Sequence, residues 1–283
     1  MAKQKREVEV VILSDIHLGT YGCHAKELVA YLKSISPKLL ILNGDVIDGW
    51  AFSKRYFPNS HMSVLSEFFK MMKKGTQVIY IIGIYYDFFC LYFDLSMGNL
   101  FLTDKYLLEI EGKKHWIFHG DVFDHTTSGS AKFIAKLGGM GYDWLILVNR
   151  AINWVLEKFG KGKVSLSKKV KNSVKKAVKF IGDFEKKATE IAINNHYDYV
   201  ICGHIHQPAD KILANEKGSV HYLNSGDWIE NLSWLEFDKG NWSLKFFNEK
   251  DFEKPIIEKN DISVNMEELI HPKVFAEFAT QKV

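Results

Sequence analysis

The sequence predicts a layered α/β fold, on three observations. Apolar runs of strand length alternate with amphipathic stretches of helical period through the first part of the chain. The apolar runs end at clusters of polar residues, as do the ligand-binding strand ends of open α/β sheets. The length of 283 residues, with 47% hydrophobic and 25% charged side chains, is typical of a globular chain and excludes one that is mainly disordered.

The first part of the chain should contain three strands and two helices. The strands are expected at residues 7–13, 38–42 and 77–82, and the helices at residues 24–35 and 61–74. Pro37 is expected to break the chain before the second strand, because proline offers no backbone N–H to a sheet. This alternation indicates a sheet covered by helices.

A helical insertion is expected at about residues 131–194, where the strand pattern disappears. Eight of the 37 basic residues, and no acidic one, lie between Lys161 and Lys179. Apolar residues recur among these lysines at helical spacing, which predicts an amphipathic cationic helix. The rest of the chain is therefore acidic on balance.

Strands are expected to return after the insertion. They are predicted at residues 199–202 and 220–223, and as a hairpin over residues 234–247. We therefore expect one domain over residues 1–247, with the insertion inside it, and a tail at residues 248–283 where periodicity is weak.

Cysteine usage and hydropathy bear on the compartment. Cys23, Cys90 and Cys202 are odd in number and widely spaced, which fits a reducing compartment better than a disulfide framework. The apolar run before Asp15 suits a strand better than a signal peptide. The most apolar stretch, residues 78–93, is shorter than the roughly 20 residues that a membrane-spanning helix needs. We expect a cytoplasmic protein without such a helix.

Four histidines and two aspartates stand at or near the ends of predicted strands. They lie in the strings SDIHLG, NGDVID, FHGD and CGHIHQP, and are Asp15, His17, Asp45, His119, His204 and His206. Imidazole together with carboxylate suits Mn, Fe or Zn. The spacing of Asp-x-His and His-x-His places both side chains on one face of an extended backbone. Any one of these motifs alone is more often a turn or a cap, but the four together predict a metal site.

These motifs resemble those of the calcineurin-like metallophosphoesterases. The longer strings SDIHLGTYGCHAKEL, NGDVIDGW, FSKRYFP and YLNSGDWIEN resemble, more narrowly, the UDP-2,3-diacylglucosamine hydrolases of lipid A synthesis. The resemblance implies a four-layer αββα sandwich, in which the helical insertion is a lid over the acyl chains. It also implies two divalent transition-metal ions, for which we expect Mn.

The resemblance assigns roles by position. Asp15, His17 and His206 would hold one ion, Asp45 would bridge the two, and His119 and His204 would hold the other. Asp45, His119 and His204 are also the expected catalytic residues. The implied reaction is hydrolysis of the pyrophosphate bond of UDP-2,3-diacylglucosamine, which gives UMP and 2,3-diacylglucosamine 1-phosphate.

Three residues are candidates for binding the substrate. Arg55 and Arg150 carry the fork of donors that suits phosphate, although a surface ion pair is an equal alternative for each. Tyr85 offers a hydroxyl to a phosphate oxygen. Asp121 and Asn224 are candidates for orienting the ligating imidazoles, with turn residues as the alternative.

One family block is altered. The family's Gly-Asn-His-Asp or Gly-Asn-Arg-Asp stands here as Gly83-Ile84-Tyr85-Tyr86. The resemblance makes that Asn a ligand of the second metal, and Ile84 has no donor atom, so we expect a weakened second site and reduced activity. Asp87 is an alternative ligand if the loop is shifted. Each change needs a single base, so relaxed selection and a sequence error both account for the string.

The lysine cluster has three interpretations: a solvated helix face, a nucleic-acid surface, or a docking face for anionic lipid. Its apolar stripe and the aromatic-rich run at residues 143–148 favour lipid over nucleic acid. We therefore expect a lipid-linked nucleotide sugar and an anionic membrane surface as partners, no nucleic acid, and a peripheral place on the inner face of the cell membrane. Two alternatives stay open: a non-catalytic relative that binds lipid or nucleotide, and a phosphoesterase of a soluble substrate.

Overall fold

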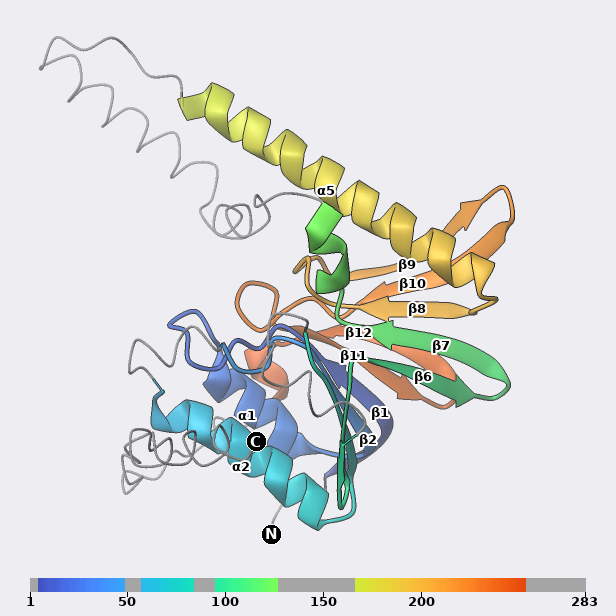
Figure 1. Cartoon of the computed structure of the whole chain (residues 1–283). Helices are drawn as coiled ribbons and strands as arrows, with labels where there is room; N and C mark the ends of the chain where they lie inside the picture. Colours follow the sequence, from blue (N-terminus) through green and yellow to red (C-terminus); the bar gives the residue numbers. More distant parts are fainter. Residues whose placement is uncertain (1–4, 49–56, 84–94, 127–165, 253–283) are drawn as a thin grey trace, which may run out of the picture.

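The computed structural model describes residues 5–48, 57–83, 95–126 and 166–252, with two β-sheets at its centre (Figure 1). The larger sheet consists of β1 (Arg6–Leu13), β2 (Ile35–Asn43), β3 (Gln77–Ile81), β4 (Leu95–Met97), β5 (Leu100–Thr103), β11 (Ser233–Asp238) and β12 (Asn241–Phe246). The smaller sheet consists of β6 (Lys105–Ile110), β7 (Lys113–Phe118), β8 (Tyr199–Cys202), β9 (Ala209–Asn215) and β10 (Gly218–Asn224).

Both sheets are mixed and have a parallel centre. The larger sheet has the order β12-β11-β1-β2-β3-β5-β4, and the smaller has the order β6-β7-β8-β10-β9. β1, β2, β3 and β5 run parallel to one another, as do β7, β8 and β10. The central strands of each sheet therefore end at the same edge.

Helices cover the outer face of each sheet. α1 (Ala25–Ser34) and α2 (Asn59–Lys73) lie on the larger sheet, and α5 (Leu166–Asn194) lies on the smaller one (Figure 1). Alternate residues of β1 face opposite ways: Val11 packs with the α1 and α2 core, whereas Ile12 packs between the sheets. Phe184 of α5 packs on the smaller sheet. The order helix, sheet, sheet, helix is the expected four-layer αββα sandwich.

The space between the sheets is filled by aliphatic side chains from both. These are Val10, Ile12, Leu39, Ile41, Ile79 and Ile81 of the larger sheet, with Ile117, Ile201 and Leu223 of the smaller one. Strands buried on both faces have nearly continuous apolar sequences, which explains why β1, β2 and β3 were predictable. Each fully buried side chain of this kind stabilises the fold by roughly 1.5–3 kcal/mol.

The predicted break at Pro37 is wrong, because β2 begins at Ile35 and runs through the proline. Pro37 pairs in register with Val8 of β1, but the pairing of β2 with β3 begins only at Leu39. Pro37 thus has no β3 neighbour to which an N–H would donate, so the missing donor leaves the ladder intact.

The strands from Leu95 to Phe118 and the strand β9 were not predicted, and the structure adds all of them to the two sheets. α5 forms the last part of the expected insertion, whereas residues 127–165 lie outside the described residues. The tail begins with a short 3-10 helix, Glu249–Asp251, and Phe252 stacks on Phe247 at 4.8 Å between ring centroids. Among the described helices, none has an apolar stretch long enough to cross a membrane.

Candidate metal centre

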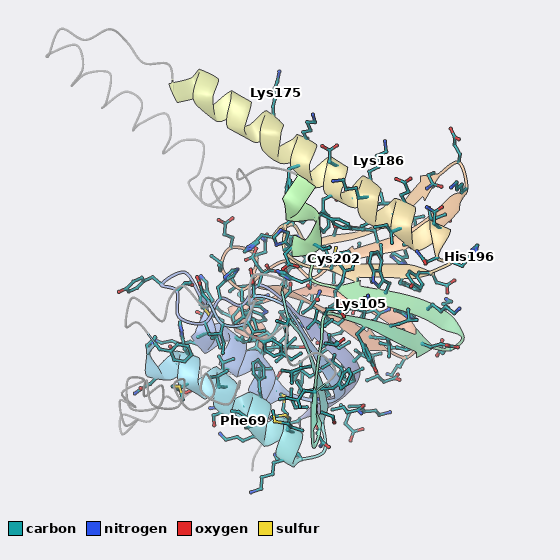
Figure 2. The ribbon with its side chains drawn as sticks, viewed as in Figure 1. Phe69, Lys105, Lys175, Lys186, His196 and Cys202 are labelled. Atoms are coloured by element: carbon teal, nitrogen blue, oxygen red, sulfur yellow. The ribbon has the colours of Figure 1, made fainter. Side chains whose placement is uncertain are left out.

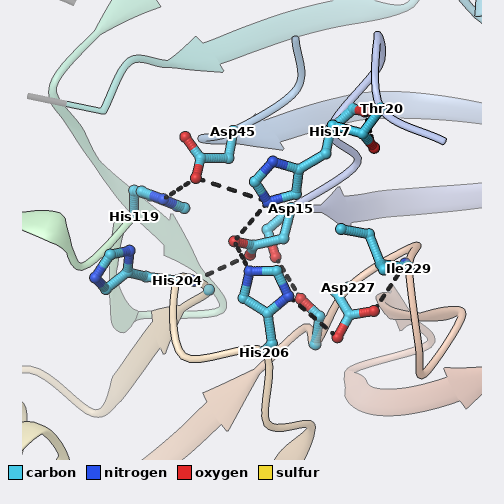
Figure 3. Close-up of polar contacts among 12 residues, drawn as sticks. Asp15, His17, Thr20, Asp45, His119, His204, His206, Asp227 and Ile229 are labelled. Atoms are coloured by element: carbon cyan, nitrogen blue, oxygen red, sulfur yellow. Dashed lines mark hydrogen bonds and ion pairs between the residues drawn. The ribbon is translucent and has the colours of Figure 1, made fainter. Parts of the chain in front are cut away.

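The predicted ligands follow the carboxyl ends of parallel strands in both sheets. Asp15 and His17 follow β1, Asp45 follows β2, His119 follows β7, and His204 and His206 follow β8. Because the ends of parallel strands share an edge, and the two sheets face each other, these loops converge at one place (Figure 3). Residues far apart in the sequence are thereby brought together.

Backbone hydrogen bonds tie the loops to one another. The N–H of His17 donates to the carbonyl of Asp45 at 2.8 Å, and the N–H of Gly203 donates to the carbonyl of His119 at 3.0 Å. The backbone N–H of His204 donates to Oδ2 of Asp15 at 3.0 Å, which links the two sheets directly. The position of each side chain thus depends on a neighbouring loop as well as on its own strand.

Five of the six predicted ligands have left-handed backbone conformations. Their φ angles are 51° at Asp15, 53° at His17, 47° at Asp45, 66° at His204 and 52° at His206. A residue with a Cβ in this conformation costs roughly 1–2 kcal/mol. Strain of this kind persists where surrounding structure fixes the backbone, and it gathers at functional sites.

The ligand atoms form two groups that share Asp15. Asp15 with His17 and His206 makes one group, and Asp15 with Asp45 and His119 makes the other. Oδ1 of Asp15 lies 3.3 Å from Nε2 of His206, and Oδ2 of Asp45 lies 3.8 Å from Nε2 of His17 and 3.6 Å from Nε2 of His119. Atoms that bind one ion at about 2.1 Å are about 3–4 Å apart, so these separations fit a shared cation.

Several of these atoms are buried without a hydrogen-bond partner in the described part of the chain: Oδ1 of Asp15, Nε2 of His17 and Nε2 of His119. Nδ1 of His119 lies 2.9 Å from the carbonyl of Asn43, which can only accept, so Nδ1 carries a proton and Nε2 is the nitrogen left to bind a cation in place of a proton. Buried polar atoms normally have partners. Carboxylate oxygens and imidazole nitrogens left open in this way fit divalent transition-metal ions.

The charges of the site favour cation binding. Burial opposes ionisation of Asp45, but His119 and then His17 hold the pKa of that carboxyl well below its usual range. Burial opposes protonation of His119 and of His206, but nearby carboxylates outweigh it. Asp45 and Asp15 raise the pKa of His119 to about 10. Asp15 and Asp227 raise the pKa of His206 to about 9. Burial lowers the pKa of His17. The carboxylates therefore impose a strongly negative potential on the histidines.

The model of the calcineurin-like phosphoesterase family matches residues 8–208. The chain belongs to this family. Membership makes it a hydrolase of the metal-dependent phosphoesterase class, and the donor set described above agrees with that class.

Two curated relatives align with more than four fifths of this phosphoesterase, over almost their whole length. The UDP-2,3-diacylglucosamine hydrolase of Aliivibrio fischeri (strain MJ11) is 23% identical over 241 residues, which are 83% of this chain and 97% of that protein. The enzyme of the same name from Blochmanniella pennsylvanica (strain BPEN) is 22% identical over 254 residues, or 84% and 96% of the two chains. Among solved structures, Yfce, a phosphoesterase from E. coli, is 14% identical with a TM-score of 0.38. The match covers 84% of this chain and 99% of that chain.

Two glycines give the phosphoesterase room for close packing at the site. A Cβ on Gly44, whose φ is +77°, would overlap the ring of His119. A Cβ on Gly203 would lie 2.5 Å from Oδ2 of Asp15. Glycine is thus required at both positions by the approach of the loops, and at Gly44 also by the backbone conformation.

The ring of His204 lies outside both ligand groups. It is beside the ring of His119, with centroids 5.1 Å apart and planes at 73°, and it faces Phe184 of α5 at 6.4 Å. Arg55, Tyr85 and Arg150 lie outside the described residues, as does Ile84. Their predicted roles stay predictions.

One of the two candidates for orienting the imidazoles, Asn224, makes another contact. Nδ2 of Asn224 donates to the carbonyl of Gly203 at 2.9 Å, so Asn224 holds the loop before His204 and not an imidazole ring. Asp121 is buried near His119 and raises its pKa, but the Nδ1 partner of His119 is Asn43. The orienting contact therefore comes from a backbone carbonyl.

Sequence reasoning missed Asp227. It is fully buried, and its Oδ2 lies 3.4 Å from Nδ1 of His206 (Figure 3). A signal for it exists in the sequence, because Asp227 follows the apolar strand β10 as the other site residues follow theirs.

Proposed function

We propose that this phosphoesterase hydrolyses the pyrophosphate bond of UDP-2,3-diacylglucosamine, releasing UMP and 2,3-diacylglucosamine 1-phosphate. One observation carries the proposal: buried, unpartnered ligand atoms of Asp15, His17 and His119 meet at the ends of strands from both sheets. The substrate is supported by the name of the two curated relatives, which match most of the chain.

The proposed roles keep the assignment that the motifs imply. Asp15, His17 and His206 would hold one divalent ion, Asp45 would bridge, and His119 and His204 would hold the second, although the ligand atoms as they lie share Asp15 and leave the ring of His204 outside both groups. Two bound ions supply a hydroxide of lowered pKa and neutralise charge on the phosphoryl oxygens. Mn is the proposed metal, because imidazole and carboxylate together suit it. Arg55, Arg150 and Tyr85 are proposed to contact the substrate, and the lack of a donor in Ile84 is proposed to weaken the second site.

The test is release of UMP from UDP-2,3-diacylglucosamine by the full chain in Mn²⁺. We expect slow turnover that Asp45→Asn abolishes, with Glu7→Gln, which changes an exposed carboxylate, as the matched control. The triple variant Ile84→Asn, Tyr85→His, Tyr86→Asp should be faster. Lack of turnover in both proteins would contradict catalysis and favour a binding relative. Equal rates on substrates with and without acyl chains would favour a soluble substrate.

We also propose that α5 binds the anionic inner face of the cell membrane. The amino-terminal half of the helix extends beyond the smaller sheet (Figure 1). Lys175 is exposed there (Figure 2). Lys179 is exposed as well, and Val178 is 64% exposed. Each lysine near an anionic surface contributes about 1 kcal/mol, and salt screens the attraction.

Sedimentation with lipid vesicles tests this surface. The full chain should bind vesicles that contain phosphatidylglycerol and should bind phosphatidylcholine vesicles weakly. Reversing the charge of Lys175 and Lys179 together should weaken binding by a factor of ten or more, since two contributions of about 1 kcal/mol are lost. Lys26→Glu on α1, at the opposite side of the molecule, is the control. Equal binding by all three proteins would contradict the proposal.

A further inference from the structure

A second carboxylate lies behind one of the predicted metal ligands. Asp227 follows β10, is fully buried, and directs Oδ2 at Nδ1 of His206 from 3.4 Å. The opposite ring nitrogen, Nε2, faces Oδ1 of Asp15 at 3.3 Å (Figure 3). The imidazole of His206 is thus held between two carboxylates, one in the ligand group and one outside it.

The orientation of Asp227 is fixed by its own turn. Its Oδ1 accepts the backbone N–H groups of Ile229, Glu230 and Asn231, at 2.8, 2.6 and 3.1 Å. The side chain of Asn231 donates to Oδ2 at 2.7 Å and to the carbonyl of His206 at 3.0 Å. The carboxylate is therefore held by its own turn, and Asn231 links the turn to the His206 backbone.

This arrangement selects one tautomer of His206. An ionised carboxylate only accepts hydrogen bonds, so Nδ1 of His206 carries a proton, and Nε2 is the nitrogen whose lone pair a bound cation would use in place of a proton. The 3.4 Å separation is long for a hydrogen bond, but such contacts are often long until a ligand binds. His119 reaches the same tautomer through the backbone carbonyl of Asn43. A carboxylate partner differs from a carbonyl in making the imidazole a stronger donor to a metal.

We propose that Asp227 is the positioning residue of the His206 site: it fixes the Nδ1–H tautomer of His206 and so directs the Nε2 lone pair toward the metal group of Asp15. This inference rests on the proposed metal-dependent function. It adds a residue that acts through a ligand and does not itself touch the ion.

The variant Asp227→Asn tests the inference sharply, because a carboxylate accepts on both sides and an amide does not. If the amide oxygen accepts the backbone N–H groups of residues 229–231, the amide NH2 faces the Nδ1–H of His206, and two donors meet. If the amide is reversed, its NH2 faces three backbone N–H groups, and donors again meet donors. Asp210→Asn is the matched control, since it makes the same change in a carboxylate that faces His221 at 2.6 Å, a histidine outside both ligand groups.

Two measurements decide the outcome. Calorimetric titration of the metal-free full chain with Zn²⁺ and with Mn²⁺ should show one site weakened 10- to 100-fold in Asp227→Asn and retained in Asp210→Asn. In the zinc-loaded wild type, nitrogen-15 NMR should show a proton on Nδ1 of His206, with the signal assigned by its loss in His206→Gln. This spectrum needs no variant at Asp227, so the inference is testable even if Asp227→Asn does not fold.

Wild-type affinity in Asp227→Asn, or a His206 ring with its proton on Nε2, would overturn the inference and leave the proposed function standing. A wild type that binds neither ion would overturn both. Metal binding that depends on Asp227, in a protein that releases no UMP, would uphold the inference and contradict only the proposed substrate.

Discussion

The backbone carbonyl of Asn43 lies 2.9 Å from Nδ1 of His119, although the two residues belong to different sheets. Asn43 ends β2 and His119 follows β7. A second contact joins the same strands, from Nδ2 of Asn43 to the carbonyl of Phe118 at 3.1 Å. The junction between the sheets and the tautomer of a predicted ligand thus depend on one residue.

Replacing Gly44 by alanine should displace His119. The new Cβ would overlap the imidazole ring, and the residue has a φ of +77°. We expect a loss of roughly 2–4 kcal/mol in the free energy of unfolding, from strain plus overpacking, and weaker metal binding. Urea unfolding and calorimetric Mn²⁺ titration measure the two effects.

Gly75→Ala is the control for this variant, because Gly75 has a φ of +101° but nothing within 4 Å of the added Cβ. It should lose only the strain contribution, roughly 1–2 kcal/mol, and bind metal normally. Equal metal affinity in both variants would show that the position of His119 does not depend on Gly44.

At His17, glycine should be more stable than alanine. The φ of 53° costs an alanine roughly 1–2 kcal/mol, which exceeds the 0.5–1 kcal/mol that glycine loses through its freer unfolded chain. We expect the free energy of unfolding of His17→Gly to exceed that of His17→Ala by about 0.5–1 kcal/mol, as measured by chemical denaturation. At the exposed helical position Lys26 the order should reverse, with alanine ahead of glycine. The same order at both positions would refute backbone strain at the site.

Glu236 should make the fold sensitive to acid. It is 2% exposed and accepts hydrogen bonds from Arg6, Tyr31 and Trp234. Burial raises the pKa of the carboxyl, but the Arg6 and Trp234 hydrogen bonds outweigh it and lower the pKa below the ordinary glutamate value. A depressed pKa means that the stabilisation is complete above that ordinary value and is lost as the pH falls through the lower, folded-state pKa.

Glu236→Gln should therefore be less stable at pH 7 by roughly 1–3 kcal/mol and lose less stability on acidification. Thermal unfolding between neutral and acid pH measures both. Glu7→Gln removes an exposed carboxylate and should match the wild type. A wild-type pH profile in Glu236→Gln would contradict the role of this carboxylate.

His61 should act as a neutral acceptor beneath the loop of His17. Its Nδ1 accepts the backbone N–H of Gly19 at 2.8 Å, and burial lowers the pKa of His61 to about 4. Its contribution should be complete above the ordinary histidine pKa of about 6.5 and fall as the pH drops toward 4. His61→Phe should lose roughly 1–3 kcal/mol at neutral pH, because the N–H of Gly19 loses its acceptor. The variant should lack the fall in stability that the His61 imidazole causes in the wild type between pH 6.5 and 4. If His61→Phe shows the same pH profile of stability as the wild type, this role is refuted.

The fold was largely predictable where strands are buried on both faces. β1 and β3 end in apolar runs at residues 10–13 and 78–81, and the bounds of both strands lie close to the predicted ones. The strands between Leu95 and Phe118 were missed because several are short or exposed on one face, so they lack such runs. The break predicted at Pro37 was wrong because β2 tolerates a proline there only if pairing with β3 begins later, and this is a property of the assembled sheet.

The convergence of the candidate ligands was predictable because their motifs follow strands that run parallel. Asp227 was missed because its role depends on a contact with His206, which is 21 residues earlier in the chain and is reached only when β8 and β10 pair. The left-handed conformations of Asp15 and Asp45 were not predictable either, since neither residue type requires a positive φ.

Anomalous diffraction from crystals of the full chain soaked in Mn²⁺ tests the central claim most directly, because it locates the ion without reference to turnover. We expect a peak within coordination distance of Asp15, His17 and His206, and a second, weaker one beside Asp45 and His119. Soaked crystals with no peak between these five side chains would contradict it.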